Sequence, residues 1–175
     1  MNLWKWSLAG TVFVSALGSI LHFVYEWSEK SVFWGIWGAV NESTWEHLKL
    51  LFWPAVFFSI AEYFFWGYRY KNFLPVKFFS ILTGMAIIVT VFYTYSGILG
   101  KNLIFMDILT FFLGAAGTYC FSFYFIQKNI WRGNRTVSFS ALMILVLALC
   151  FILFTFIPPY MGLFRDPVSA GYGIL

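Results

Sequence analysis

Five apolar runs, each long enough to cross a bilayer as a helix, constrain what this chain can fold into. A helix needs about 20 residues to cross a hydrocarbon layer of roughly 30 Å. The composition agrees, because 61% of the 175 residues are hydrophobic and only 10% are charged, which lies outside the range of soluble domains. The sequence predicts an all-α, polytopic membrane helix bundle in one domain, residues 1–175, with transmembrane helices over residues 7–27, 47–67, 74–98, 103–126 and 137–161.

A shorter apolar stretch, residues 31–40, lies between the first two predicted helices and reads SVFWGIWGAV. It is too short to span a bilayer, so it is expected to lie in the membrane interface or to re-enter the bundle packed on protein. If this segment folds back, the end of the first helix and the start of the second become neighbours.

The lysines and arginines predict the orientation, because such residues near helix ends are retained on the cytoplasmic side. Seven of them precede the first helix, flank the second connection or fill the fourth: Lys5, Arg69, Lys71, Lys77, Lys128, Arg132 and Arg135. We therefore expect a multi-pass protein of the plasma membrane with a cytoplasmic N-terminus and an extracytoplasmic C-terminus. The net charge of +4 follows from this topology and requires no nucleic-acid partner.

The segment over residues 22–49 concentrates the ionisable groups, since it holds both histidines and four of the seven carboxylates. Two pairs within it stand four residues apart, the spacing that brings side chains together on one helix face. A folded-back 31–40 segment would gather the two pairs and a second histidine at the extracytoplasmic surface. The candidate catalytic residues are His22, Glu26, Glu42, Glu46 and His47.

These residue types support three interpretations of the cluster. Two imidazoles with a carboxylate are what a catalytic divalent metal such as zinc requires, and the candidate ligands are His22, Glu26, Glu46 and His47. The same groups without metal can serve as general acid and base. The third interpretation is structural, because residues 43–46 fit a capping box, in which the Ser43 hydroxyl and the Glu46 carboxylate satisfy each other's backbone amides.

Five further polar residues are expected to surround this cluster: Asn41, Lys49, Asp107, Arg165 and Asp166. The last two belong to a C-terminal segment that follows Pro158 and Pro159, which should end the fifth helix. This segment either lies back across the mouth of the bundle, where Arg165 pairs with a glutamate, or anchors the chain in the interface.

Glu62 lies apart from the cluster, in the inner half of the second predicted helix. One interpretation is that its side chain extends toward Arg69 or Lys71 at the membrane surface. The other is that it forms a proton or cation step on a path leading inward from the cluster.

Three motifs carry a resemblance to a known family: HFVYEWS, NESTWEHLK and the closing PPYMGLFRDPVSAGYGIL. The chain resembles, over essentially its whole length, a family of small bacterial integral-membrane proteins with an Asn-Glu-Ser-x-Trp-Glu-His-x-Lys signature. That family has no established activity, so the resemblance implies a shared fold and site without a reaction. His22 and Glu26 are also loosely similar to a motif of the emopamil-binding sterol isomerase family, but the helix number and the nearby Glu42 differ, so that activity is not carried over.

Two classes of function follow from these features. The first is an enzyme at the outer leaflet that uses the cluster for acid/base or metal-assisted chemistry on a lipid or another apolar substrate. The second is a small transporter or ligand-binding membrane protein, in which the cluster is an outer gate and Glu62 continues the path. The 24% aromatic content suits a cavity for an apolar ligand and equally suits a lipid-facing surface. Membrane lipids are the expected partners in both cases.

Overall fold

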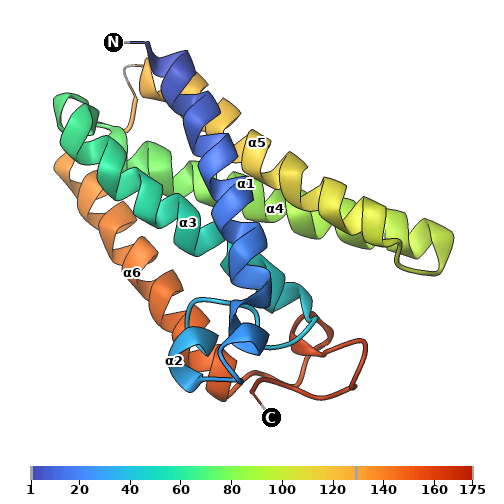
Figure 1. The fold of residues 1–175 in the computed structure, drawn as a ribbon. Coiled ribbons are helices and arrows are strands. Elements are labelled where there is room, and N and C mark those ends of the chain that lie inside the picture. Colours follow the sequence, from blue (N-terminus) through green and yellow to red (C-terminus); the bar gives the residue numbers. More distant parts are fainter. Residues whose placement is uncertain (1, 129, 175) are drawn as a thin grey trace.

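The computed structural model describes residues 2–128 and 130–174, and its regular elements are all helical (Figure 1). Within these residues the only β-type pairing is an isolated bridge between Arg165 and Tyr172. The elements in chain order are α1 (Leu3–Trp27), α2 (Val32–Gly35), α3 (Thr44–Phe65), η1 (Gly67–Arg69), α4 (Phe73–Leu99), α5 (Ile104–Ile126), α6 (Asn134–Phe156) and η2 (Gly162–Phe164).

Five of these helices, α1, α3, α4, α5 and α6, are long and apolar enough to cross a membrane. The predicted helix bundle with five spans is thereby confirmed, and it indicates a multi-pass membrane protein. The helix ends differ from the prediction by a few residues. Helix α3 begins three residues earlier because Ser43 caps it, its hydroxyl accepting from the amide of Glu46 at 3.4 Å. Helix α6 ends at Phe156, just before the two prolines.

The long helices form a bundle from which one hairpin diverges (Figure 1). Helices α4 and α5 run side by side, and α1 crosses them while packing along α3. At the crossing a Cβ atom on Gly10 would overlap the ring of Tyr119, so glycine lets α1 and α5 approach closely. Beyond this crossing the C-terminal half of α1 and the N-terminal half of α5 separate (Figure 1).

The segment between α1 and α3 folds back on the protein, which is one of the two arrangements expected from the sequence. It carries the single turn of α2, and its backbone is tied to both flanking helices. The amide of Ala39 donates to the Leu21 carbonyl at 3.3 Å, and the Trp53 indole donates to the Ile36 carbonyl at 3.1 Å. These bonds satisfy backbone groups that a lipid environment cannot satisfy. They also bring the end of α1 next to the start of α3.

A buried ion pair fixes the first turns of α3 to the rest of this end of the bundle. Lys49 Nζ lies 2.5 Å from Glu46 Oε2, and the two side chains are 0% and 2% exposed. The same ammonium group donates to the Gly35 carbonyl at 2.8 Å and to Thr155 Oγ1 at 2.9 Å. One side chain of α3 therefore holds the segment before it and the end of α6.

A second buried ion pair lies toward the other end of α3. Glu62 pairs with Lys77 at 2.5 Å, and Lys77 also donates to Ser122 Oγ at 2.8 Å. The expectation that Glu62 extends to Arg69 or Lys71 was wrong. Lys77 lies inside α4, as the predicted span over residues 74–98 implies, but it is buried, whereas the sequence interpretation had counted it among the charges that flank the second connection.

Pro54 interrupts the hydrogen bonding of α3, because proline has no amide to donate to the carbonyl of Leu50. Gly18 of α1 packs against this carbonyl, since a Cβ atom on it would lie 2.6 Å from the oxygen and 2.5 Å from the Phe111 ring. Any larger residue at this position would therefore push α1 away from α3 and α5.

Candidate functional site

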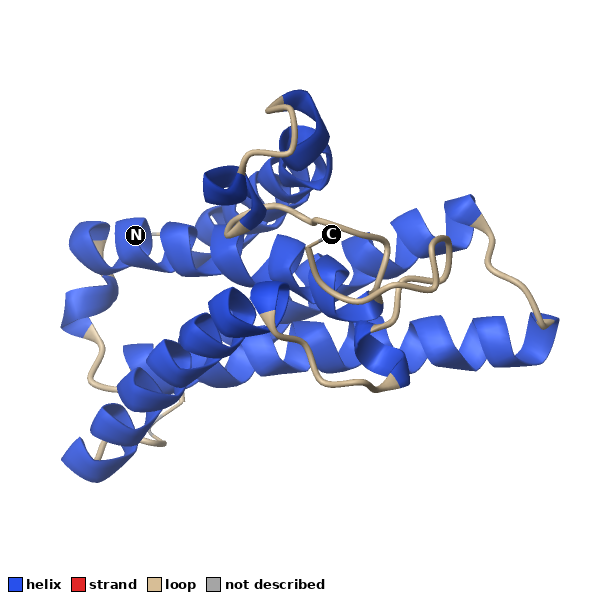
Figure 2. Ribbon diagram, turned by 90° about the horizontal axis from the view of Figure 1, so that it is seen from below, coloured by secondary structure: helices blue, strands red, loops and turns tan. Residues whose placement is uncertain are grey.

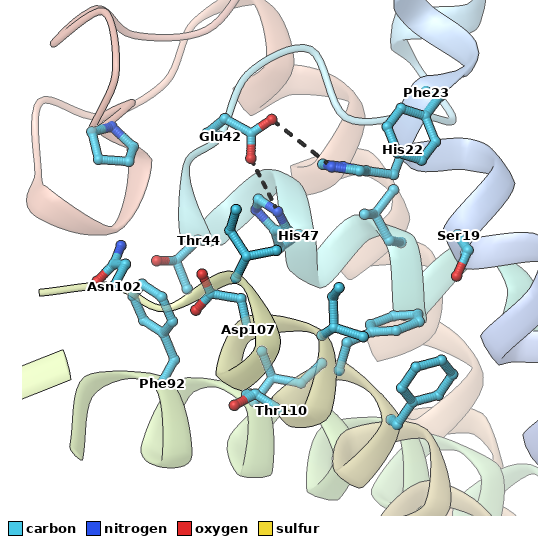
Figure 3. Close-up of a pocket in the computed structure, with 18 of the residues that line it drawn as sticks. Ser19, His22, Phe23, Glu42, Thr44, His47, Phe92, Asn102, Asp107 and Thr110 are labelled. Carbon is cyan, nitrogen blue, oxygen red and sulfur yellow. Dashed lines mark ion pairs between the residues drawn. The ribbon is translucent and has the colours of Figure 1, made fainter. Parts of the chain in front are cut away.

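A cavity of about 570 Å³ opens where α1 and α5 separate, at the end of the bundle that carries α2 (Figure 3). Its volume lies within the range of small-molecule sites. The walls are mostly apolar and come from α1, α3, α4, α5 and the C-terminal segment. The polar and ionisable lining residues are Ser19, His22, Glu42, Thr44, His47, Asn102, Asp107 and Thr110.

Three ionisable side chains converge at the mouth of this cavity. Glu42 lies between the two histidines, with Oε1 3.9 Å from His22 Nε2 and Oε2 3.5 Å from His47 Nε2 (Figure 3). The two imidazole rings are 5.3 Å apart between centroids. We refer to His22, Glu42 and His47 as the His/Glu cluster. It brings together residues from the end of α1, the loop before α3 and the first turn of α3.

The local structure of α3 sets the direction of His47. Its Nδ1 atom lies 2.9 Å from the carbonyl oxygen of Ser43, the N-cap residue, so a proton on Nδ1 has a ready acceptor. The other ring nitrogen, Nε2, faces Glu42. Metal-binding histidines in proteins typically donate their other ring N–H to such a carbonyl, which fixes the tautomer and the ring.

The cluster has the dimensions of a metal site. One donor atom from each of its three residues lies within 4.8 Å of the others. A tetrahedral zinc ion with ligands at about 2.1 Å separates its donor atoms by roughly 3.4 Å. His47 Nε2 and His22 Nε2 lie 3.5 and 3.9 Å from Glu42, but from different carboxylate oxygens, so the carboxylate would have to rotate to offer one oxygen to an ion shared with both rings. Because the three side chains are only partly buried, small rotations can close the difference.

His22 is held by packing more than by hydrogen bonds. Its ring packs edge-on against Phe23 at 4.7 Å between centroids. Its Nδ1 atom is buried and has no hydrogen-bond partner within the described chain. His22 therefore lacks the orienting bond that His47 has, and the atom left to interact within the cavity is Nε2.

Asp107 lines the same cavity from the first turn of α5. The hydroxyl of Tyr95, on α4, donates to Asp107 Oδ1 and so fixes the orientation of the carboxylate. Asp107 was predicted as an outer member of the site, whereas Tyr95 was missed. Tyr95 could have been found from the sequence by its position, because it lies one turn from the end of an apolar predicted helix, at the depth expected for Asp107.

Two predicted members of the cluster lie outside it. Glu26 is exposed at the end of α1, and Glu46 turns away from the histidines toward Lys49. The capping box is half formed, because Glu46 accepts from the amide of Val40 at 3.1 Å. The amide of Ser43 instead donates to the side chain of Asn41 at 2.9 Å. The carboxylate that lies between the histidines is Glu42.

The C-terminal segment covers part of the mouth. Pro167 and Val168 line the cavity, and Figure 2, which looks onto this end, shows the C-terminal loop lying across the helix ends. Asn41 donates to the Gly173 carbonyl at 3.0 Å. Arg165 is exposed and makes no ion pair within residues 2–128 and 130–174, so its predicted partner glutamate is not seen.

Asp166 holds the turn of this segment together. Its Oδ1 accepts from the amide of Val168 at 2.9 Å, and its Oδ2 accepts from the amide of Ser169 at 3.2 Å and from that residue's hydroxyl at 2.5 Å. Burial raises the pKa of Asp166, but these hydrogen bonds outweigh burial and hold its pKa below the usual range. Its role is to shape the turn that places the segment over the cavity.

Comparisons with known proteins identify a family for the chain. Neither the curated proteins nor the solved structures contain a match. A family model described as a family of unknown function (DUF6512) matches residues 1–174. This result agrees with the predicted kinship to a family without an established activity. The chain therefore belongs to the DUF6512 family.

Proposed function

We propose that this protein is a membrane-embedded hydrolase that holds a divalent metal ion at the His/Glu cluster and acts on a lipid or another apolar substrate. The observation that carries the proposal is the convergence of three ligand-type side chains at the mouth of a mostly apolar cavity. Two imidazoles and a carboxylate are a ligand set of catalytic zinc sites, which leave a coordination position open for water.

The residues have separate tasks in this proposal. His22, Glu42 and His47 hold the ion, which when bound lowers the pKa of a water molecule toward about 7. Asp107 lines the same cavity and acts as the general base that accepts a proton from the attacking water. Tyr95 is a positioning residue, since its hydroxyl orients the Asp107 carboxylate.

The cavity is open to the side from which lipid chains arrive. Ile104 and Ile108 of α5 line it and are 80% and 52% exposed, and the half-exposed Phe23 lines it from α1. In a membrane these side chains contact acyl chains, so an apolar substrate can enter without crossing water.

The transporter alternative is supported less well. Its path from the cluster toward Glu62 would require polar groups at successive depths, yet Glu62 and Lys77 are absent from the cavity lining. Each of these two residues is already paired with the other. Metal-free acid/base chemistry uses the same cluster and differs only in the absence of bound ion.

Elemental analysis of the detergent-purified protein tests the proposal. We expect about one equivalent of zinc or another transition metal in the wild type. We expect His47→Ala and Glu42→Gln to lose it, and Glu26→Gln, which changes an exposed carboxylate outside the cluster, to retain it. A folded wild type without metal after incubation with zinc would refute the metal centre. Hydrolysis of a lipid substrate by that protein would then indicate metal-free acid/base chemistry.

The proposed location is the extracytoplasmic side of the plasma membrane, because lysine and arginine dominate the connections at the opposite end of the bundle. In a variant without Cys120 and Cys150, the substitution Ser169→Cys should allow reaction with a membrane-impermeant maleimide in intact cells. A cysteine at Lys71 should react only after lysis. The reverse pattern would place the cavity on the cytoplasmic side.

A further inference from the structure

The charges around the cavity discriminate between classes of lipid. Two carboxylates, Glu42 and Asp107, line it, and no lysine or arginine of the described chain does. Lys49, two residues after His47, is fully enclosed and already paired with Glu46. Arg165 and Lys101 lie at the same end of the molecule, but both are exposed and neither lines the cavity.

A divalent ion at the His/Glu cluster would cancel the charge of the two carboxylates and leave no surplus positive charge. Enzymes that act on phosphate esters supply arginine or lysine clamps or a second metal ion, because the reacting group is an anion. A phosphate group in this cavity would lie against Asp107, and the described lining offers no lysine or arginine to add to the charge of the single metal ion. An uncharged carbonyl group meets no such repulsion, and a single metal ion is sufficient to polarise it.

The apolar walls indicate where the remainder of the substrate lies. Ile104, Ile108 and Phe112 form a strip along α5 that lines the cavity and is also exposed. Residues at this spacing lie on one face of a helix. A single hydrocarbon chain placed along this strip, continuous with the surrounding lipid, would leave its polar end at the cluster.

We infer that the substrate is an uncharged lipid ester or amide, bound with its acyl chain along the Ile104–Ile108–Phe112 strip and its carbonyl at the His/Glu cluster. This inference rests on the proposed function. In the reaction, the oxygen of water bonds to the carbonyl carbon, and the bond to the alcohol oxygen or amine nitrogen breaks. The proton that Asp107 takes from water passes to that leaving atom. The products are a fatty acid and an alcohol or amine, with no change in oxidation state.

The test compares photoreactive probes that share one diazirine-bearing hydrocarbon chain. The probes are a monoacylglycerol, an N-acylethanolamine and an alkyl phosphate, each added to zinc-incubated protein in nanodiscs of ether-linked lipids, which contain no carbonyl esters. Crosslinking to the α5 peptide measures binding, and released fatty acid measures turnover. We expect the two uncharged probes to label residues 104–112 at least about tenfold more than the phosphate probe. Equal or stronger labelling by the alkyl phosphate would overturn the inference.

Variants separate the causes of this preference. Asp107→Asn removes the negative charge at similar size, so it should raise phosphate labelling severalfold and narrow the difference between probes. Ile108→Trp should reduce labelling by all probes because it fills the strip, whereas Leu109→Trp should not, since Leu109 is partly exposed but does not line the cavity. Unchanged discrimination in Asp107→Asn would contradict the charge argument.

The two proposals fail in distinguishable ways. Selective labelling by the uncharged probes without release of fatty acid would refute the hydrolase and leave the binding preference standing. Labelling and cleavage of a phosphate-bearing lipid would leave a hydrolase standing and refute the inferred substrate class.

Discussion

The buried pair of Glu46 and Lys49 allows a quantitative prediction about stability. Lys49→Met removes the ammonium group and leaves the Glu46 carboxylate buried at 2% exposure without its partner. It also removes the donors to the Gly35 carbonyl and to Thr155 Oγ1. Breaking one half of a buried pair costs about 3–5 kcal/mol, mostly because the remaining charge is uncompensated. We expect the free energy of unfolding to fall by that amount.

The assay is reversible unfolding of the purified protein in mixed micelles with increasing SDS, followed by circular dichroism. Lys101→Met is the matched control, because Lys101 is exposed, and it should change the free energy of unfolding by less than about 0.5 kcal/mol. The double variant Glu46→Gln with Lys49→Met should recover about 2–3 kcal/mol relative to the sum of the single changes. A loss below about 1 kcal/mol for Lys49→Met, the value of an exposed pair, would refute the reasoning.

Three further changes test other contacts. Gly18→Val should overpack against Phe111 and the Leu50 carbonyl, lower the free energy of unfolding by about 1–3 kcal/mol and reduce probe labelling. Little change in either quantity would show that α1 can shift freely. Lys77→Met should lower the free energy of unfolding by about 3–5 kcal/mol in the same SDS titration, because it leaves Glu62 buried and unpaired. A loss as small as that of Lys101→Met would contradict this expectation. Asp166→Ala should speed hydrogen exchange at the amides of Val168 and Ser169, while unchanged exchange would show that the turn forms without the carboxylate.

The fold was largely predictable because its strongest signal is local. Each transmembrane helix is a long apolar run, and its length and composition alone identify it. The ends were less accurate, since they depend on caps and prolines within one turn. Because Ser43 caps α3, this helix begins earlier in the sequence than predicted. Helix α6 ends earlier than predicted because the chain leaves the helix before Pro158.

The sequence predicted that a His/Glu cluster forms, but it identified the residues that converge only in part. The spacing of four residues suggested that His22 pairs with Glu26 and that Glu42 pairs with Glu46. In the structure the members of each suggested pair point to different surroundings. Glu46 faces Lys49, its i,i+3 neighbour on α3, and it also accepts from Thr155 of α6, 109 residues away, a partner that no local pattern reveals. Glu42 lies in the loop before α3, where its direction depends on how the 31–40 segment folds back.

The enclosure of Lys49 also has a consequence for motion. His47 sits in the same turn of α3 as the buried pair, and that turn is fastened to the chain before it and to α6. Rotating this part of α3 to widen the cavity would break the buried hydrogen bonds of the Lys49 ammonium group to the Gly35 carbonyl and to Thr155. The wall that yields when a bulky molecule enters is therefore expected on the opposite side, in the diverging α4–α5 hairpin, while the histidine side stays still and keeps its geometry.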